Sequence, residues 1–243
     1  MKWVKAAVQL LWKIYFAVVL TLSLLFLYPI YLVVLNLDSQ LEYGFKLTRF
    51  QAKLILLLIG IRTEVKGAIP NDKEISYIIC PNHTSYLDIL VLYAVFPHYF
   101  VFLGKKELGK IPLFKLFFKK LNILVDRQNP KGAYDAILKA SKRLEDGTNV
   151  VIFPEGTISQ LAPRLRPFKN GAFKIASRLN MPIVPVSFLD NYLLLEDSAK
   201  FGARSRPGKV RVIIHDPLFP QSNSEEDLLN LRKQCQEAIA SVL

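Results

Sequence analysis

Two residues five positions apart, His83 and Asp88, have the types and the spacing of a catalytic base and its partner. The apolar run Tyr77–Cys80 predicts a short buried strand that leads into Pro81-Asn82-His83. Ser85 stands three positions before Asp88, which is the spacing of a capping box, so we expect a helix to start there with Ser85 as its N-cap. The resulting chain reversal brings the Asp88 carboxylate to the imidazole, where it fixes the tautomer and leaves the other ring nitrogen basic.

A histidine held in this way suits acyl transfer to an alcohol. His83 would remove the proton of the hydroxyl group while its oxygen attacks a thioester carbonyl, and a positioned general base contributes roughly 10²- to 10⁴-fold to such a rate. No protein nucleophile is needed, and the chain contains no Gly-x-Ser-x-Gly motif of a serine hydrolase. A helix cap next to an unrelated histidine would explain the same pair, so the rest of the chain must decide.

A second polar turn follows another apolar run. Asn149–Phe153 predicts a strand that stops at Pro154-Glu155-Gly156-Thr157, because proline ends ladder pairing and glycine permits a sharp turn. At the edge of an α/β sheet such a turn meets a ligand. The Glu155 carboxylate could accept from a substrate hydroxyl, and loop N–H groups could hold a phosphate or an oxyanion. An ordinary strand-to-loop turn is the competing interpretation.

The elements that must position these motifs alternate between strand and helix. This alternation predicts an α/β fold with a mixed, mostly parallel sheet flanked by helices, in a catalytic domain over residues 62–243 that follows an N-terminal anchor over residues 1–61. The predicted elements are strands at Tyr77–Cys80, Tyr99–Leu103, Ile123–Val125, Asn149–Phe153, Ile183–Phe188 and Lys209–Ile214, and helices at Asp88–Val95, Lys131–Glu145, Asn170–Leu179 and Ser224–Val242.

The N-terminus predicts a hydrophobic two-helix membrane anchor. Ile14–Leu35 contains no charged residue and exceeds the ~20 residues that cross a bilayer as a helix. Pro29 offers a kink, and a second helical limb over Leu41–Ile61 has a basic face. We favour a monotopic hairpin on the cytoplasmic face of the inner or plasma membrane over a single span, because a span would separate the catalytic domain from cytosolic acyl donors. Hydropathy alone does not distinguish the two.

The composition indicates an anionic partner. Lys and Arg outnumber Asp and Glu by 32 to 20, a net charge of +12, while 51% of the residues are hydrophobic. The hydropathy favours anionic membrane lipids over nucleic acid, and no nucleic-acid-binding motif is present. The basic amphipathic stretch Ile111–Leu124 fits either docking beside the first hydrophobic limb or a place in the core. The two cysteines have neither the spacing of metal ligands nor that of a disulfide framework.

Five motifs in a fixed order resemble the 1-acylglycerol-3-phosphate acyltransferase (lysophosphatidate acyltransferase) family, over about residues 75–190. They are Asn82-His83 to Asp88, Lys105-Lys106-Glu107-Leu108 to Pro112, Asp126-Arg127, Phe153 to Thr157, and Val184-Pro185-Val186; the segment Pro167 to Phe173 is similar as well.

The resemblance implies an O-acyltransferase of phospholipid biosynthesis. It would transfer a fatty acyl group from acyl-CoA or acyl-carrier protein to the sn-2 hydroxyl of lysophosphatidic acid, giving phosphatidic acid without a metal or a cofactor. His83 would be the general base and Asp88 its partner, and Lys105 and Arg127 would bind phosphate. The substrate-binding residues implied by the matching motifs are Asn82, Ser85, Lys105, Arg127, Phe153, Pro154, Glu155, Gly156, Thr157, Lys169 and Gly171.

One departure leaves the acceptor open. The family has an arginine after Gly-Thr that contacts the phosphate, whereas this chain has Ile158. Arg164, Arg166 or Lys169 could substitute for that cation. Alternatively, the acceptor is a lyso-aminolipid with a free hydroxyl on its acyl chain. A non-catalytic basic membrane-binding protein is the alternative from a different class.

Overall fold

The computed structural model describes residues 2–37, 41–70, 72, 75–110, 112–126 and 129–243, with the side chains of residues 112–114, 119 and 130 outside the description. Within these ranges seven strands form one sheet in the order β1-β7-β6-β2-β5-β3-β4. Neighbouring strands are parallel except for the antiparallel pair β6 and β7. The predicted mixed, mostly parallel α/β sheet is therefore confirmed. The strands are β1 (Ile61–Lys66), β2 (Ile78–Pro81), β3 (Phe100–Lys105), β4 (Ile123–Val125), β5 (Asn149–Val151), β6 (Ile183–Phe188) and β7 (Gly208–Ile214).

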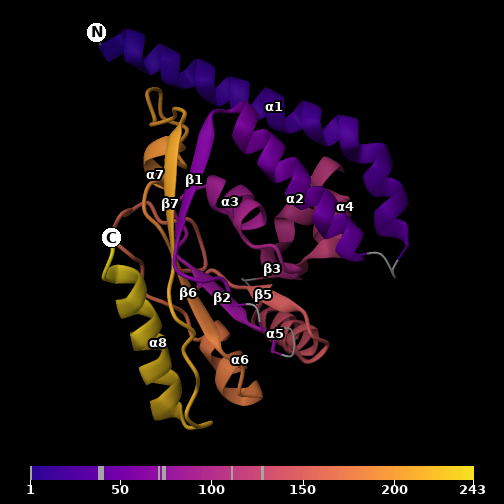
Figure 1. Cartoon of the computed structure of the whole chain (residues 1–243), viewed down its shortest axis with the longest axis vertical. Coiled ribbons are helices and arrows are strands. Elements are labelled where there is room, and N and C mark those ends of the chain that lie inside the picture. The colour runs from indigo at the N-terminus through magenta and orange to yellow at the C-terminus, as the bar shows by residue number, and fades with distance from the viewer. Residues whose placement is uncertain (1, 38–40, 71, 73–74, 111, 127–128) are drawn as a thin grey trace.

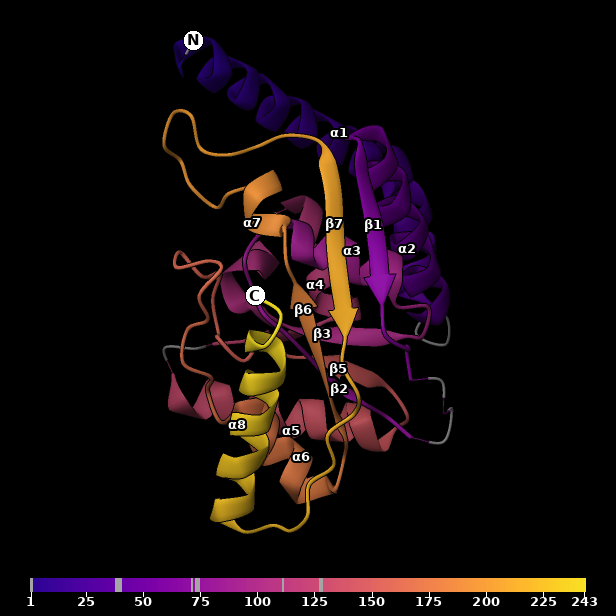
Figure 2. The same ribbon diagram turned by 60° about the vertical axis from the view of Figure 1, so that its left-hand side comes forward.

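Helices cover both faces of the sheet (Figures 1 and 2). Central strands buried on both faces place alternate residues in different cores. Ile79 of β2 joins the cluster with α2 and α3, whereas Ile78 and Cys80 join the cluster with α5, α6 and α8. The helices are α1 (Lys2–Asn36), α2 (Leu41–Leu58), α3 (Leu87–Val95), the 3₁₀-helix η2 (Lys106–Lys110), α4 (Pro112–Leu121), α5 (Pro130–Glu145), α6 (Gly171–Leu179), α7 (Asn191–Leu194) and α8 (Glu225–Ala240).

The edge strand β1 is a correction to the sequence-based prediction, which continued the second hydrophobic limb to Ile61. In the structure α2 ends at Leu58, Gly60 adopts a φ of 72°, and the chain pairs with β7 from Ile61 onward. Ile61 is the only fully buried residue of β1, so the strand carries no apolar alternation that a sequence pattern could reveal. The predicted boundary between residues 61 and 62 falls at the start of this strand.

The two predicted N-terminal helices are present as α1 and α2, and α1 is long and apolar enough to cross a membrane. Pro29 lies within α1, which bends toward its C-terminal end (Figure 1). One side of α1 packs on the α/β domain. There the ring centroids of Tyr31 and of Phe117 in α4 lie 4.2 Å apart. The amphipathic stretch therefore docks beside the first limb. The other side is an exposed apolar stripe with a residue every three or four positions: Val4, Val8, Leu11, Tyr15, Val18, Leu22, Phe26, Ile30 and Val33.

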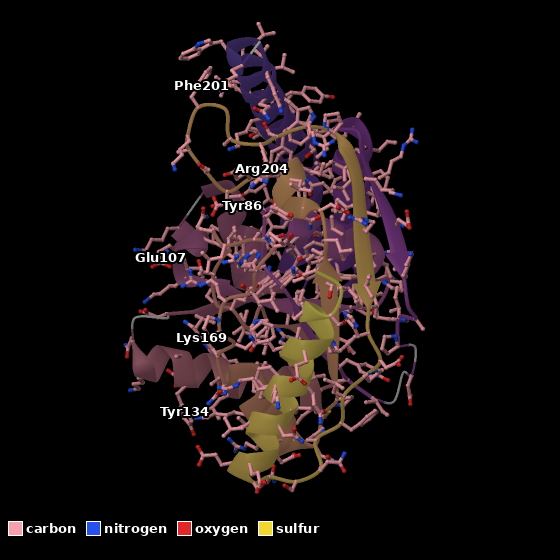
Figure 3. The ribbon with its side chains drawn as sticks, turned by 90° about the vertical axis from the view of Figure 1, so that its left-hand side faces the viewer. Tyr86, Glu107, Tyr134, Lys169, Phe201 and Arg204 are labelled. Carbon is pink, nitrogen blue, oxygen red and sulfur yellow. The ribbon has the colours of Figure 1, made fainter. Side chains whose placement is uncertain are left out.

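The N-terminal part of α1 also rests on the loop that follows α7. Lys13 Nζ donates to the backbone carbonyls of Glu196 (3.2 Å) and Ser198 (2.7 Å), and Ser205 Oγ donates to the carbonyl of Gln9. Phe201 lies beside the start of the helix (Figure 3), with its ring centroid 5.8 Å from that of Trp3. Thus α1 contacts the α/β domain near both of its ends.

Candidate active site

The predicted functional motifs gather at one edge of the sheet because their strands are parallel neighbours. Ile79 of β2 pairs with Val151 of β5, and Val151 pairs with Phe102 of β3. The carboxyl ends of these strands therefore lie at the same end of the sheet, which is where open α/β sheets bind ligands. His83 follows β2, the Phe153–Thr157 turn follows β5, and Lys105 ends β3.

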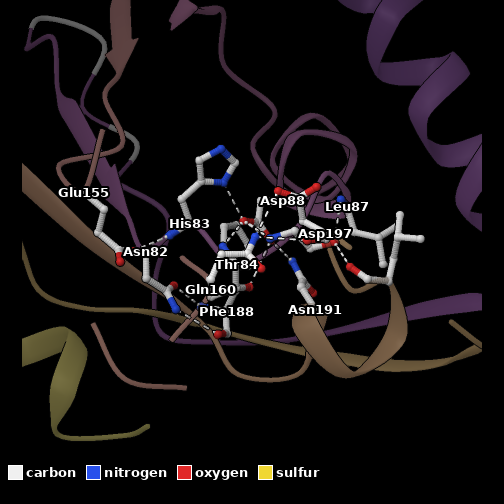
Figure 4. Close-up of polar contacts among 12 residues, drawn as sticks. Asn82, His83, Thr84, Leu87, Asp88, Glu155, Gln160, Phe188, Asn191 and Asp197 are labelled. Carbon is white, nitrogen blue, oxygen red and sulfur yellow. Dashed lines mark hydrogen bonds and ion pairs between the residues drawn. The ribbon is translucent and has the colours of Figure 1, made fainter. Parts of the chain in front are cut away.

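His83 and Asp88 meet as the spacing predicts. The Nδ1 atom of His83 lies 2.8 Å from Oδ2 of Asp88 (Figure 4), with 14% of the His83 side chain and none of the Asp88 side chain exposed. Oδ2 also accepts from the backbone N–H groups of Thr84 (2.6 Å) and Ser85 (3.0 Å). These two N–H groups fix the position of Oδ2 beside the imidazole. A carboxylate accepts hydrogen bonds and cannot donate them, so Nδ1 carries the proton of the neutral imidazole. The other ring nitrogen, Nε2, is then unprotonated and available as the base.

The start of α3 differs from the predicted capping box. The helix begins at Leu87, and its N-cap is Tyr86, without a side-chain capping bond. Ser85 Oγ accepts from Leu87 N–H (3.1 Å) and donates to the carbonyl of Leu195 (2.6 Å), and the side chain is fully buried. Ser85 therefore joins the helix start to the segment after β6, and this geometry argues against the predicted contact with substrate.

Asn82 is also a structural tie rather than a group open to substrate. Its Nδ2 donates to the carbonyl of Phe188 (3.1 Å), and its Oδ1 accepts from the same residue's N–H (2.7 Å). The side chain is 0% exposed. Both polar groups of Asn82 are thus used to hold the end of β2 against β6, and this geometry argues against the predicted contact between Asn82 and substrate.

Glu155 links the two predicted motifs through their backbones. One carboxylate oxygen accepts from His83 N–H (2.7 Å) and the other from Arg166 N–H (2.9 Å), while the residue is 2% exposed. Burial raises the pKa of Glu155, although the two N–H groups act in the opposite direction. Because both oxygens already have protein donors, this geometry argues against the predicted contact between Glu155 and a substrate hydroxyl.

The same turn holds His83 at two further points. The Ser159 N–H donates to the His83 carbonyl (2.7 Å), so the backbone of His83 is bonded on both sides. The ring of Phe153 stacks on the imidazole at a centroid distance of 3.9 Å, and Phe102 stacks on Phe153 in turn. Phe153 is buried, and at the site it contacts the plane of the His83 ring. Pro154 accepts from Lys169 N–H (2.8 Å) and thereby brings Lys169 to the turn.

The predicted phosphate-binding cations are partly placed by the structure. Lys105 is exposed at the end of β3, whereas the neighbouring Lys106 forms an ion pair with Asp126 (3.2 Å). Lys169 is exposed (Figure 3) and crosses Gly156 so closely that a Cβ there would lie 2.9 Å from Lys169 Cε and 3.0 Å from Nζ. Thr157 is exposed beside it, and Gly171 begins α6. Arg127 lies outside the described residues.

Sequence reasoning missed one residue that contacts the pair directly. Asn191, at the start of α7, donates from Nδ2 to Oδ1 of Asp88 at 2.6 Å. A signal was present, because β6 runs parallel to β2 and Asp190-Asn191 follows its carboxyl end. Ligands bind at the carboxyl ends of the strands in such sheets, and this rule indicated the Glu155 turn. It would also indicate Asn191 once the strand order is known.

Comparison with known proteins finds similar sequences and a similar fold. The crystal structure of the 1-acyl-sn-glycerophosphate (LPA) acyltransferase PlsC from Thermotoga maritima superposes with a TM-score of 0.79 at 25% identity, covering 98% of this chain and 97% of that one. The 1-acyl-sn-glycerol-3-phosphate acyltransferase of Haemophilus influenzae is 34% identical over 74% of this chain and 73% of its own length. The chloroplastic enzyme BAT2 of Brassica napus is 30% identical over 81% of this chain, which spans 55% of that longer relative.

The family model described as Acyltransferase matches residues 62–189, which include β2, β5 and the His83, Asp88 and Glu155 network. This match extends over more than half of the chain. The chain therefore belongs to the acyltransferase family.

Proposed function

We propose that this chain transfers a fatty acyl group from acyl-CoA or acyl-carrier protein to the sn-2 hydroxyl of 1-acylglycerol-3-phosphate, giving phosphatidic acid. The observation that supports it most directly is the His83 imidazole, which is bonded through Nδ1 to the buried Asp88 carboxylate. The pair lies where the carboxyl ends of β2, β5 and β3 come together. The acceptor comes from relatives named 1-acyl-sn-glycerol-3-phosphate acyltransferases.

In the proposed reaction Nε2 of His83 takes the proton of the sn-2 hydroxyl as its oxygen attacks the thioester carbonyl carbon. The negative charge of Asp88 stabilises the imidazolium that forms. The new C–O bond completes the ester as the C–S bond breaks, and the imidazolium returns its proton to the departing thiolate. This series of steps needs no protein nucleophile, metal or resident cofactor. Histidine is the side chain that most often carries out such a proton transfer.

Lys169 supports a phosphate-bearing acceptor despite Ile158. Its ammonium group lies over the Gly156 turn, next to the loop that carries Glu155 and the His83 backbone contacts. A cation at this point attracts a phosphate, which accepts charge-assisted hydrogen bonds. We therefore assign to Lys169 the contact that an arginine at position 158 would make. A lyso-aminolipid is the second candidate acceptor, because Ile158 removes that guanidinium from the loop.

Acceptor specificity tests the proposal. Purified protein is assayed with acyl-CoA and with acyl-carrier protein, against both 1-acylglycerol-3-phosphate and a lyso-aminolipid. We expect phosphatidic acid to be the product, and Lys169→Met to raise KM for the phosphate acceptor several-fold while Lys174→Met, an exposed lysine of α6, leaves it unchanged. Acylated aminolipid without detectable phosphatidic acid would overturn the proposal, and absence of both products would favour a non-catalytic membrane protein.

We further propose a monotopic association with the cytoplasmic leaflet of the inner or plasma membrane. The exposed apolar stripe runs along one side of α1, as expected of a helix lying in the interface. The other side contacts the α/β domain near both ends, through Lys13 and through Tyr31. A helix that crossed the bilayer would carry its two ends to opposite sides, so these contacts favour the hairpin. Lys2 and Lys5 at the start of the helix suit anionic lipids.

Cysteine labelling distinguishes the hairpin from a span. Lys2→Cys and Asn36→Cys mark the two ends of α1, and Lys174→Cys marks the α/β domain; all three positions are exposed. In sealed cells we expect a membrane-impermeant maleimide to label none of them, and in inverted vesicles to label all three. Labelling of Lys2→Cys from the outside, with Asn36→Cys protected, would show that α1 crosses the membrane.

A further inference from the structure

The two oxygens of the Asp88 carboxylate are held by different parts of the chain. Oδ2 faces His83, whereas Oδ1 accepts from Nδ2 of Asn191 at 2.6 Å, from a residue 103 positions further along (Figure 4). The only other contact recorded for Oδ1 among the described residues is the Thr84 hydroxyl, at 3.5 Å. Asn191 and Asp88 are both 0% exposed. We propose that Asn191 is a positioning residue for the acyl transfer, which it serves by fixing the rotation of the Asp88 carboxylate; this inference rests on the proposed function.

The segment that carries Asn191 is itself fixed against the catalytic loop. Asp190, next to Asn191, forms a two-point ion pair with Arg211 of β7, at 2.8 Å from Nε and 2.7 Å from Nη2. At the other end of α7 the carbonyl of Leu195 accepts from Ser85 Oγ. The short helix therefore meets the His83–Asp88 loop at both ends. These contacts hold the backbone that carries Asn191 next to Asp88.

The chemistry of the contact suits a carboxylate that must stay charged. An amide N–H stabilises the anion without adding a positive charge that would compete with the His83 imidazolium. Without this donor the carboxylate could turn about its Cβ–Cγ bond, because terminal torsions of this kind are broad. Oδ2 would then lose its alignment with Nδ1. Asn191 thus acts on the reacting atoms through Asp88 and not by touching substrate.

A second observation separates function from packing. The Oδ1 atom of Asn191 is buried and lacks a hydrogen-bond partner among the described residues. A buried acceptor without a partner lowers stability, and a leucine of similar size would avoid that loss. The amide is therefore poorly explained as a stabilising core residue. Its donor half, which reaches Asp88, is the part that the site uses.

The test compares Asn191→Leu, Asp88→Asn and the double variant in the full-length protein, with 1-acylglycerol-3-phosphate and acyl-CoA. We expect Asn191→Leu to lower kcat by ~10- to 100-fold and to leave KM nearly unchanged. Losses of this size are typical when a hydrogen-bond partner that orients a metal-binding side chain is removed. Adding it to Asp88→Asn should cause little further loss, because the effect passes through Asp88. Ser205→Ala, which removes a buried hydrogen bond to Gln9 away from Asp88, should leave kcat unchanged.

Asn191→Asp keeps the shape of the side chain and provides a second measurement if the leucine variant folds poorly. Two facing carboxylates must share a proton, and the protonated carboxyl group introduced by this substitution can donate to Asp88 as the amide does. The ratio of variant to native kcat should therefore rise as the pH is lowered. Full kcat in Asn191→Leu while Asp88→Asn is inactive, or additive losses in the double variant, would overturn the role of Asn191. Full activity in Asp88→Asn would overturn the proposed mechanism itself.

Discussion

Replacing His83 by alanine is expected to lower kcat for phosphatidic acid formation by ~10²- to 10⁴-fold, which is the range for loss of a positioned general base. The Gly156 turn and Lys169, which is proposed to bind the phosphate, stay in place, so KM should change much less than kcat. The fold should also survive, because the Asp88 carboxylate keeps Thr84 N–H, Ser85 N–H and the Asn191 amide as partners. Steady-state kinetics together with thermal unfolding of the purified variant measure both parts of this expectation.

The control for this variant is His98→Ala. His98 lies in the turn between α3 and β3, away from the strand edge that holds His83. Its replacement should leave kcat and KM at their native values. A folded His83→Ala variant with native kcat would reject the proposed mechanism, whereas equal losses in both histidine variants would indicate a general effect on the fold.

The Glu155→Gln variant should show the second large effect, through the backbone and not through contact with substrate. An ionised carboxylate offers two acceptor oxygens, whereas glutamine offers one acceptor and one NH₂ donor. Either His83 N–H or Arg166 N–H then faces an NH₂ group, and a buried donor without a partner costs about 1–3 kcal/mol. We expect the melting temperature to fall by about 2–4 °C per kcal/mol and kcat to fall at least ~10-fold as His83 shifts.

Glu145→Gln provides the matched exchange at an exposed glutamate, the last residue of α5. It should change neither the melting temperature nor kcat. A Glu155→Gln variant of native stability but with a raised KM for the acceptor would contradict the backbone role and return Glu155 to the substrate, as the sequence motif predicted. Measuring unfolding and kinetics on the same preparation separates these outcomes.

The sequence predicts local features of this protein well. The strand before His83, the turn after β5 and the α/β alternation all have short-range signals, such as apolar runs ended by proline or glycine. The edge strand β1 was missed because only Ile61 in it is fully buried. Asn191 was missed because its partner is 103 residues away and the strand order had to be known first.

For three predicted site residues the sequence does not identify the hydrogen-bond partner, and the physical reason is another one. Asn82, Ser85 and Glu155 are polar residues in functional motifs, and the sequence indicates that each needs a hydrogen-bond partner. It does not indicate whether that partner is a ligand or the protein's own backbone. In the structure all three are buried and bonded to backbone groups of distant segments. Among the predicted substrate-binding residues that the structure describes, Thr157, Lys105 and Lys169 are the exposed ones.

The packing of α1 has a consequence for how far this protein can be divided. Trp12, Phe16 and Leu20 lie against the main core, and Lys13 supports the backbone of the segment after α7. The helix that carries the exposed apolar stripe therefore also covers part of the core of the α/β domain. Exchanging it for an unrelated anchor would preserve attachment to lipid and expose core side chains to water. The thirty-five residues proposed to attach the protein to the bilayer are thus also part of its folding unit.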